Sequence, residues 1–404
     1  MREFATYAKV RASPTEASIE NLAHVADVVV DTERSDPDDV MIRAVAQLGL
    51  FPRAIVPLVD VLVGAQYGSE GKGNIAAYLA REYDVLVRVG GPNAGHKVAY
   101  PKYTFVHLPA GTSRNPNARL IIGPGAVIDL EVLMKEIQDC HVDAERLSID
   151  PQAMIIEESD KAWEEQNLNQ MGSTKQGVGA ATARKILGRE EQAVLGAKVR
   201  LVRDIEALAP YRRHTAEALD RAYAAGHRIL LEGTQGTSLS IHHGFWPKVT
   251  SRETTTAGCL ADAGIAPLRV RRVIMVTRTY PIRVGGDSGY MKREISTKIV
   301  SERSGLPLDD IDKTERASRT GRSRRISEFD WAQVRRAAML NGATDIALTF
   351  SDYIRKENQQ ARRYEQLTRE TIMFIEELER ITGVPVSLIS TRFELRNIID
   401  RRAW

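Results

Sequence analysis

The chain has 404 residues, of which 43% are hydrophobic and 27% are charged, and its formal net charge is +3. This composition excludes collagen-like, coiled-coil and mostly disordered proteins, and the length is sufficient for a large buried core. The charge balance gives no indication of nucleic-acid binding, because 56 lysines and arginines accompany 53 aspartates and glutamates. Two cysteines cannot form a disulfide framework, and we find neither an apolar signal core nor a membrane-spanning run. We therefore expect a cytoplasmic protein that has no nucleic-acid or membrane partner.

Residues 1–57 differ in pattern from the rest of the chain. Asp36 and Pro37 open an acidic turn, and apolar residues then recur between 40 and 48, which predicts a capped amphipathic helix. We expect this helix to dock and the rest of the segment to form a mobile arm. We interpret 1–57 as an N-terminal extension of unknown role, and 58–404 as one large domain with excursions.

Buried-strand patterns alternate with helical patterns after residue 58. Strands are predicted at 58–63, 85–89, 120–122, 229–231, 273–276, 346–349 and 385–389, and helices at 75–80, 215–225, 331–340 and 360–381. This alternation predicts an α/β fold, in which a mostly parallel central sheet is flanked by helices on both faces.

The segment that follows the first predicted strand is the most informative one. Its ten residues, 64–73, read Gly-Ala-Gln-Tyr-Gly-Ser-Glu-Gly-Lys-Gly. Closely spaced glycines let backbone N–H groups approach an anion, Lys72 adds a positive charge, and the next helix adds the dipole of its N-terminus. The loop resembles a P-loop but lacks the Walker pattern, because Gly73 stands where a serine or threonine would bind magnesium.

A second glycine-rich loop, 88–96, follows the next predicted strand. Its glycines and proline hold the backbone tightly, so that Asn93 and His96 project from a rigid loop at a strand end. Ligands usually bind at this end of the strands in open α/β sheets. A single histidine is more often structural than catalytic, but the position of His96 after a phosphate-type loop favours chemistry.

These two loops resemble the N-terminal signatures of the adenylosuccinate synthetase family. Further segments that resemble family motifs follow in the same order at 172–179, 231–237, 249–258, 319–325 and 381–391. The resemblance covers about 58–404, which would be the catalytic domain, and it leaves the first 57 residues unexplained. It implies a single α/β domain with a P-loop-like nucleotide loop.

The resemblance also implies a reaction. Members of the family phosphorylate the 6-oxygen of a purine nucleotide, and the amine of aspartate then displaces the phosphate to form a carbon–nitrogen bond. It implies Mg²⁺ as the metal, Ser69, Lys72 and His96 as catalytic residues, and Ser69 with the carbonyl of Gly95 at the metal. His96 would hydrogen-bond to the 6-oxygen, and Lys72 would neutralise phosphates. A homodimer is expected, because family sites borrow an arginine from the neighbouring subunit.

Matching positions imply three groups of binding residues. The purine nucleotide is expected at Ser69, Glu70, Gly71, Lys72, Asn93, Ala94, Gly95, His96, Ser173, Thr174, Arg189, Gln235, Thr250 and Arg322. The phosphate donor is expected at Gly68, Glu70, Gly71, Lys72, Gly73, Asn74, Gly95, His96, Lys97, Arg324, Ser351, Asp352 and Ser390. L-Aspartate is expected at Ser318, Arg319, Thr320, Gly321, Arg322 and Arg324, whose planar cations suit carboxylates.

Ser69 departs from the family pattern, which has an aspartate that takes the N1 proton of the purine and binds magnesium. A serine is a poor base and removes one carboxylate from the metal. Three interpretations remain open: an inactive nucleotide-binding relative, an ordinary synthetase that uses IMP, or an enzyme for another purine. Serine here resembles phage relatives that act on dGMP, the 2-aminoadenylosuccinate synthetases. We predict dGMP as the substrate and, if the chain is phage-encoded, the host cytoplasm as its location.

Other departures concern the phosphate donor and the subunit contact. Phe350 replaces the lysine with which the family contacts the guanine of GTP, which favours ATP or dATP, although Phe350 could also simply cap a buried strand. Gln176 and Gly188 stand where arginines are usual, and Arg189 is the candidate to reach the neighbouring subunit. Lys97 replaces a usual threonine. The Ser-Glu pair at 327–328 replaces a usual Gly-Trp, and nothing physical explains it.

Overall fold

The computed structural model describes residues 22, 24–50, 55–168, 172–190, 192–316 and 323–403. The chain divides into two units, Met1–Ile55 and Val56–Trp404. In the first unit, helix α3 (Pro37–Gln47) begins after Asp36, whose side chain accepts a 2.8 Å hydrogen bond from the backbone N–H of Asp39. The predicted capped helix is confirmed, whereas its docking stays a prediction. No described helix is both long enough and apolar enough to span a bilayer.

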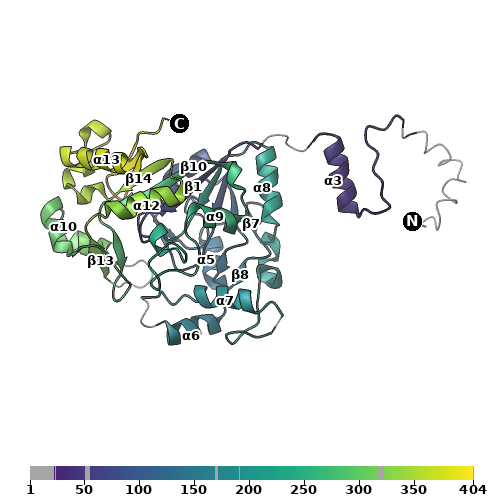
Figure 1. Cartoon of the computed structure of the whole chain (residues 1–404), viewed down its shortest axis with the longest axis horizontal. Helices are drawn as coiled ribbons and strands as arrows, with labels where there is room; N and C mark the ends of the chain where they lie inside the picture. The colour runs from purple at the N-terminus through teal and green to yellow at the C-terminus, as the bar shows by residue number, and fades with distance from the viewer. Residues whose placement is uncertain are drawn as a thin grey trace, which may run out of the picture. The chain divides into compact units, whose positions relative to one another are not determined.

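The second unit contains a nine-stranded sheet with the strand order β16-β15-β14-β10-β1-β9-β2-β5-β7 (Figure 1). Its strands are β1 (Val59–Gly64), β2 (Val85–Arg88), β5 (Arg119–Ile122), β7 (Leu147–Ile149), β9 (Ile229–Glu232), β10 (Val270–Arg278), β14 (Asp345–Thr349), β15 (Val386–Ser390) and β16 (Ile398–Asp400). Every pairing is parallel except that of β15 with β16. The predicted α/β fold is confirmed, and the sheet contains every strand that the sequence predicts.

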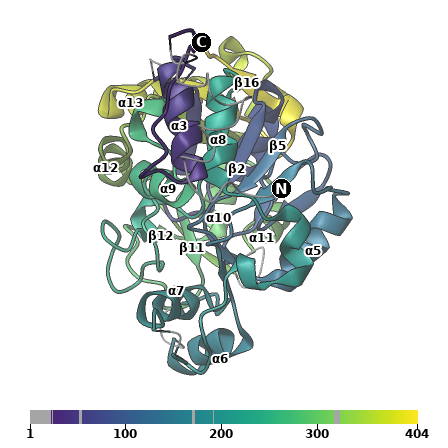
Figure 2. The ribbon, with the colours of Figure 1, turned by 90° about the vertical axis from the view of Figure 1, so that its right-hand side faces the viewer.

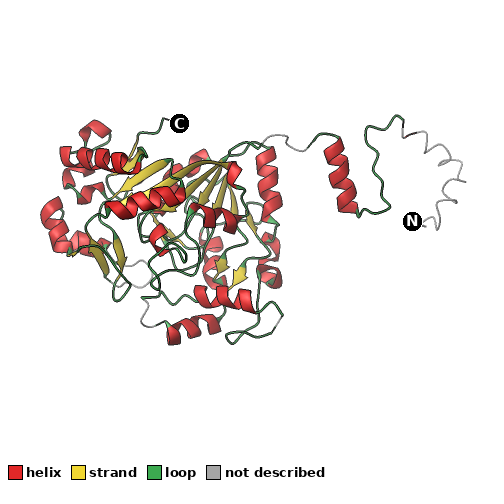
Figure 3. Cartoon of the chain, viewed as in Figure 1, coloured by secondary structure: helices red, strands yellow, loops and turns green. Residues whose placement is uncertain are grey.

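Helices cover both faces of this sheet, as Figure 3 shows. The helices of this unit are α4 (Lys72–Leu79), α5 (Leu130–Asp139), α6 (Glu158–Asn167), α7 (Val178–Leu187), α8 (Thr215–Ala224), α9 (Thr256–Ala263), α10 (Thr297–Ser304), α11 (Leu308–Thr314), α12 (Trp331–Asn341) and α13 (Arg369–Thr382). Alternate residues of β1 separate the two apolar layers. Leu62 packs with α4 and α5, whereas Val61 and Val63 pack with α8, α9, α12 and α13.

Shorter strands complete the second unit. They are β3 (His96–Val98), β4 (Tyr103–Phe105), β6 (Val127–Ile128), β8 (Met154–Ile155), β11 (Ile282–Val284), β12 (Glu294–Ile295) and β13 (Arg324–Ser327). The antiparallel sheet β11-β13-β12 places Arg324 at the start of its middle strand. Helices α6 and α7 lie side by side at one end of the unit in the views of both Figure 1 and Figure 2.

One predicted helix is too long at its start. The sequence predicts a helix over 360–381, but α13 begins at Arg369, and Lys356–Gln360 and Tyr364–Gln366 form 3₁₀ turns instead. The buried side chain of Asn358 explains the difference. It donates to the carbonyl of Ser351 (2.8 Å) and accepts from the backbone N–H of Thr368 (3.0 Å), which fixes the chain in a turn before α13.

The parallel strands bring the predicted motifs to one edge of the sheet. Strands β1, β2 and β9 are neighbours, and they end at Gly64, Arg88 and Glu232. Strands β10 and β14 end on the same side, at Arg278 and Thr349. The loops that follow these strands therefore meet at the carboxyl edge, where open α/β sheets bind ligands.

Candidate active site

The carboxylate of Glu70 holds the glycine-rich loop, 64–73, through hydrogen bonds within the loop. Gly68 and Gly71 have φ of +97° and +87°, which a side chain would strain, and Gly71 caps α4. The buried ammonium of Lys72 donates to Glu70 Oε2 (2.7 Å) and to the carbonyl of Gly68 (3.2 Å). Glu70 Oε1 accepts from the backbone N–H of Gly68 (2.8 Å) and of Gln66 (3.0 Å). The loop is therefore rigid, and the charge of Lys72 is balanced inside the protein.

Two cavities meet at this loop. The smaller cavity has a volume of about 340 Å³ and the larger cavity about 610 Å³. Gly68, Ser69, Gly95 and Arg324 line both. Ser69 therefore lies at the junction of two spaces, each of a size that suits a nucleotide-sized ligand.

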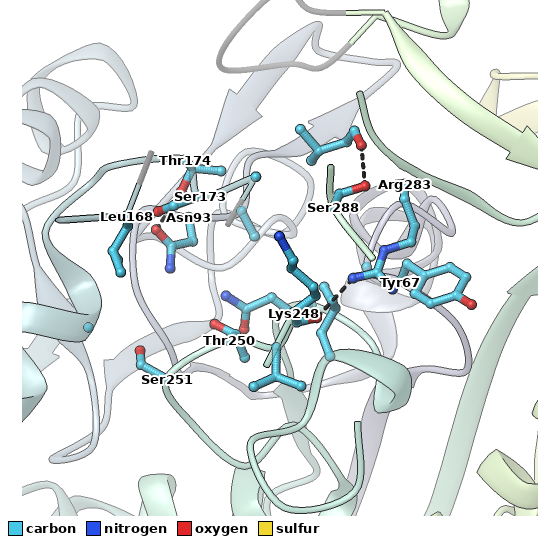
Figure 4. Close-up of a pocket in the computed structure, with 18 of the residues that line it drawn as sticks. Tyr67, Asn93, Leu168, Ser173, Thr174, Lys248, Thr250, Ser251, Arg283 and Ser288 are labelled. Atoms are coloured by element: carbon cyan, nitrogen blue, oxygen red, sulfur yellow. Dashed lines mark hydrogen bonds between the residues drawn. The ribbon is translucent and has the colours of Figure 1, made fainter. Parts of the chain in front are cut away.

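Most of the predicted site residues line one of these cavities. Those at the smaller cavity are Gly68, Ser69, Asn93, Ala94, Gly95, Ser173, Thr174, Gln235, Thr250 and Arg324, of which Figure 4 labels Asn93, Ser173, Thr174 and Thr250. Those at the larger cavity are Gly68, Ser69, Gly71, Lys72, Gly73, Asn74, Gly95, His96, Lys97, Arg324, Asp352 and Ser390. Glu70 and Ser351 are buried and line neither cavity, and the exposed Arg189 also lies outside both. Ser318, Arg319, Thr320, Gly321 and Arg322 lie outside the described residues, so the aspartate site stays a prediction.

His96 lines the larger cavity directly after Gly95 and is buried beside Glu232, a carboxylate that the sequence patterns do not predict as a site residue. Its Nδ1 contacts Glu232 Oε1, and Arg88 Nη1 donates to the same oxygen at 2.7 Å. The backbone N–H of Ala110 donates to Glu232 Oε2 at 2.7 Å. Burial, reinforced by the Arg88 cation, lowers the pKa of His96 to about 4. Burial alone would raise the pKa of Glu232, but Arg88 and His96 outweigh it and hold that pKa below its ordinary value.

Two partners make opposite demands on Nδ1 of His96. An ionised carboxylate such as Glu232 only accepts hydrogen bonds, whereas the guanidinium of Arg88, whose Nη1 lies 2.6 Å from Nδ1, only donates. The other ring nitrogen, Nε2, is buried and has no hydrogen-bond partner in the described structure. Whichever nitrogen carries the hydrogen of the neutral ring, a second proton would form an imidazolium, which the carboxylate of Glu232 would stabilise.

Other buried polar atoms around the cavities also lack partners in the described structure. They are Asn74 Nδ2 at the larger cavity, and Gln235 Nε2 and Ser251 Oγ at the smaller cavity. Buried polar groups in native proteins are nearly always hydrogen-bonded. Unpartnered donors that line a cavity are therefore typical of contacts made by a bound ligand.

A buried charge cluster contacts residues that line the larger cavity. The guanidinium of Arg278 lies 3.8 Å from the ring centroid of Phe350, and its Nη2 donates to Glu315 Oε1 at 2.5 Å. Tyr353 donates to the same oxygen at 2.9 Å, and Arg324 Nη1 lies 3.6 Å from Glu315 Oε2. Phe350 thus follows β14 and also lines the cavity, and its effect on the choice of phosphate donor stays a prediction.

Sequence patterns did not identify Arg88, Glu232, Arg278 or Glu315 as site residues. The available signal was a charged residue at the end of an apolar strand, where a buried charge requires a partner. Arg88, Glu232 and Arg278 are each the last residue of a buried strand. Which of them meet depends on the strand order, and a single sequence does not reveal it.

The oxygen atoms near Ser69 suit only one kind of magnesium site. The described residues contain no group of three or more His, Cys, Asp or Glu side chains that could hold a metal. The hydroxyl of Ser69 and the carbonyl of Gly95 are neutral ligands. Mg²⁺ commonly keeps several waters and binds mainly through substrate phosphates. The residues therefore fit a Mg²⁺ that arrives with its nucleotide, and do not form a preformed carboxylate cage.

A rigid glycine-rich loop at the carboxyl edge of a parallel sheet, between two joined cavities, defines an α/β nucleotide-binding enzyme. The family model "Adenylosuccinate synthetase" matches residues 61–196 and 195–359. The adenylosuccinate synthetase of Pyrococcus horikoshii is 38% identical over 356 residues, which are 85% of this chain and 98% of the relative. That of Methanocaldococcus jannaschii is 38% identical over 361 residues, 87% of this chain and 99% of the relative. The chain belongs to the adenylosuccinate synthetase family, whose members are ligases that form a carbon–nitrogen bond in purine nucleotide synthesis.

Two solved structures resemble this fold. Fully ligated adenylosuccinate synthetase of Plasmodium falciparum has a TM-score of 0.73 at 21% identity and covers 85% of this chain and 100% of its own. Succinoaminodeoxyadenylate synthetase of cyanophage S-2L, bound to dGMP and to dATP as an energy donor, has a TM-score of 0.68 at 29% identity. That alignment covers 86% of this chain and 96% of the phage protein.

Proposed function

We propose that this chain joins L-aspartate to the 6-position of dGMP, with ATP or dATP as the phosphate donor. The product would be 2-amino-2'-deoxy-N6-succinyladenylate. The observation that carries the proposal is Ser69, which lies at the junction of the two cavities. The resemblance places an aspartate, and with it a base and a metal ligand, at this position.

The chemistry of the base edge explains why a serine favours guanine. Guanine carries a 2-amino group next to N1, whereas hypoxanthine carries only hydrogen there. The smaller serine leaves room for that group, and its hydroxyl can accept a hydrogen bond from N1 or from the 2-amino group. The structure of the cyanophage S-2L protein, whose ligands are dGMP and dATP, supports the same assignment.

The cavity walls suit the two steps of a ligase reaction. The purine 6-oxygen attacks the γ-phosphorus of the donor, the bond to the leaving diphosphate breaks, and the N1 proton is lost. The aspartate amine then attacks carbon 6, and phosphate departs with the former 6-oxygen. His96 would contact that oxygen, and Lys72 would neutralise the transferred group. Mg²⁺, when bound, supplies further charge neutralisation on the phosphates.

The larger cavity supports an adenine donor. Phe350 offers an apolar face where a lysine would contact a guanine oxygen, and Phe393 and Asp352 line the same cavity. Burial raises the pKa of Asp352 to about 6, so this carboxyl is more readily protonated than a surface aspartate. A protonated carboxyl can donate to N1 of adenine and accept from its 6-amino group, which a carboxylate alone cannot do.

Ordinary adenylosuccinate synthesis from IMP is the second candidate function. The archaeal relatives named adenylosuccinate synthetase are 38% identical to this chain, which exceeds the 29% identity of the phage protein. The third interpretation, an inactive relative, conflicts with the number of matching residues that line the cavities.

One assay separates the three functions. Phosphate release is measured with ATP, L-aspartate and Mg²⁺, with either dGMP or IMP as the nucleotide, and each product is identified by mass. The proposal expects aspartate-dependent release with dGMP and little with IMP. Preferential release with IMP would establish the ordinary synthetase, and no release with either would establish an inactive relative.

A further inference from the structure

Lys248 is a cation of the smaller cavity that matching to the family does not identify. Figure 4 shows its side chain in the middle of the view, with Asn93, Ser173 and Thr174 on one side and Ser288 and Arg283 on the other. The side chain of Lys248 is only 15% exposed. Its ammonium donates to the carbonyl of Asp287 (3.0 Å) and to the carboxylate of Asp287 (2.8 Å).

The ammonium lies beside the predicted nucleotide loop. The carbonyl oxygen of Asp287, to which Lys248 donates, is 3.3 Å from the position that a Cβ would take at Gly172. Gly172 immediately precedes Ser173 and Thr174, which line the same cavity. The hydroxyl of Thr174 donates to Asn93 Oδ1 at 2.7 Å, so this loop is tied to the second glycine-rich loop. An anion on this loop would therefore lie near Lys248.

The other cations around the smaller cavity already have partners within the protein. Among the described residues that line it, Arg283, Arg324 and Lys248 carry a fixed positive charge. Arg283 lies over the ring of Tyr67 at 4.6 Å and donates to the carbonyls of Tyr290 and Lys248. Arg324 sits at the junction, 3.6 Å from the buried carboxylate of Glu315. In Figure 4, Arg283 lies on the opposite side of the view from Ser173 and Thr174.

The backbone N–H groups at the start of α7 also have a partner within the protein. The carboxylate of Glu164 accepts from the backbone N–H of Gly177 (2.9 Å) and of Gly179 (2.7 Å). This carboxylate occupies the position at which a helix N-terminus would otherwise bind a phosphate. Lys175, in the same loop, pairs with Glu165 at 2.7 Å and does not line the cavity. A dianion at Ser173 and Thr174 thus needs another positive partner.

We propose that Lys248 binds the 5'-phosphate of the purine nucleotide, and that its ammonium exchanges Asp287 for a phosphate oxygen when the nucleotide enters. This inference rests on the proposed function only in taking a purine nucleoside monophosphate as the ligand of the smaller cavity. Asp287 is well suited to be a temporary partner, because its side chain is 77% exposed and returns to water without cost from burial. Lys248 then keeps a partner in both states, and its charge is never buried alone.

The test compares a nucleotide with its nucleoside by calorimetric titration of the full chain. Lys248→Met should weaken the binding of dGMP by roughly 10- to 100-fold, which is the usual effect of losing a charge-assisted hydrogen bond. It should leave the binding of deoxyguanosine unchanged, because the nucleoside has no phosphate. Lys248→Arg should retain most of the affinity for dGMP. Lys135→Met is a matched control, since Lys135 is 73% exposed on α5 and also pairs with an aspartate.

Asp287→Asn separates ligand binding from a structural role. If Asp287 only holds Lys248 until the nucleotide arrives, this variant should bind dGMP as tightly as the wild type or more tightly. Equal losses for dGMP and deoxyguanosine in Lys248→Met would overturn the inference, as would an Asp287→Asn defect as large as that of Lys248→Met. If the chain binds IMP and not dGMP, the proposed function fails, and the same comparison with IMP and inosine still decides the role of Lys248.

Discussion

The chemical role of His96 can be tested with a single substitution. Its Nδ1 faces Glu232, and its buried Nε2 has no partner in the described structure. We expect His96→Asn to lower kcat by roughly two orders of magnitude or more, as loss of a general acid or base does. His227→Asn, at a half-buried position outside both cavities, is the control. Near-normal turnover in His96→Asn, with an unchanged circular dichroism spectrum, would make His96 a structural residue.

Asp352 has a pH-dependent effect on stability whose sign follows from its pKa. Burial raises that pKa to about 6 in the folded chain, compared with an ordinary value of about 3.9. The folded state therefore disfavours the ionised form, so this penalty is full above pH 6 and disappears as the pH falls below 4. Asp352→Asn should increase the free energy of unfolding by up to about 3 kcal/mol at pH 8 and by little at pH 4. Urea unfolding at the two pH values measures this, and an equal effect at both would contradict it.

At the scale of elements, a buried ion pair joins helix α6, which carries Asp160, to helix α7, which carries Arg184. Arg184 and Asp160 are each 0% exposed, and Arg184 Nε donates to Asp160 Oδ1 at 3.0 Å. Asp160→Asn leaves the guanidinium without its counter-charge and should destabilise the chain by about 3–5 kcal/mol. Glu158→Gln in the same helix is the control, since that side chain is 87% exposed and a surface pair contributes about 1 kcal/mol or less. Equal denaturation midpoints for the two variants would contradict this account.

The sequence predicts most strands of the central sheet, because their signals are local. Runs of β-branched residues are sufficient to find the inner strands, and the Asp36 cap locates α3. The sequence does not predict strands β7 and β16, since three-residue strands at the sheet edges carry too short a pattern. The predicted start of α13 is wrong because the turn at Asn358 depends on side-chain contacts with Ser351 and Thr368, which lie outside the helical spacing of three or four residues.

The candidate site was predictable only where it follows a motif. Ser69, Lys72 and His96 belong to continuous glycine-rich segments, and the structure places all three at one junction or beside it. Glu232 and Lys248 come from distant segments, and their partners are set by strand order and by loop packing. Physical proximity of this kind leaves no local pattern in a single sequence.

At the scale of the whole molecule, the proposed dimer makes a prediction about Arg189. This exposed residue follows α7 and lines neither cavity of its own chain, as expected if it acts in the neighbouring subunit. Arg189→Ala and His96→Asn would each be inactive alone, but a mixed dimer would hold one complete site. Random mixing should restore up to about a quarter of wild-type activity. Absence of any recovery after refolding the two variants together would reject Arg189, and a strictly monomeric active enzyme would reject the dimer.

The central claim is that Ser69 selects the purine, and one ratio tests it most directly. The ratio is kcat/KM for dGMP divided by kcat/KM for IMP, measured in the wild type and in Ser69→Asp under the same ATP, L-aspartate and Mg²⁺. An aspartate would crowd the 2-amino group of guanine, and steric discrimination of this kind is typically about 10- to 1,000-fold. We predict a wild-type ratio well above one and a fall of at least about tenfold in Ser69→Asp. A wild type that prefers IMP, or a ratio that Ser69→Asp leaves unchanged, would contradict the account.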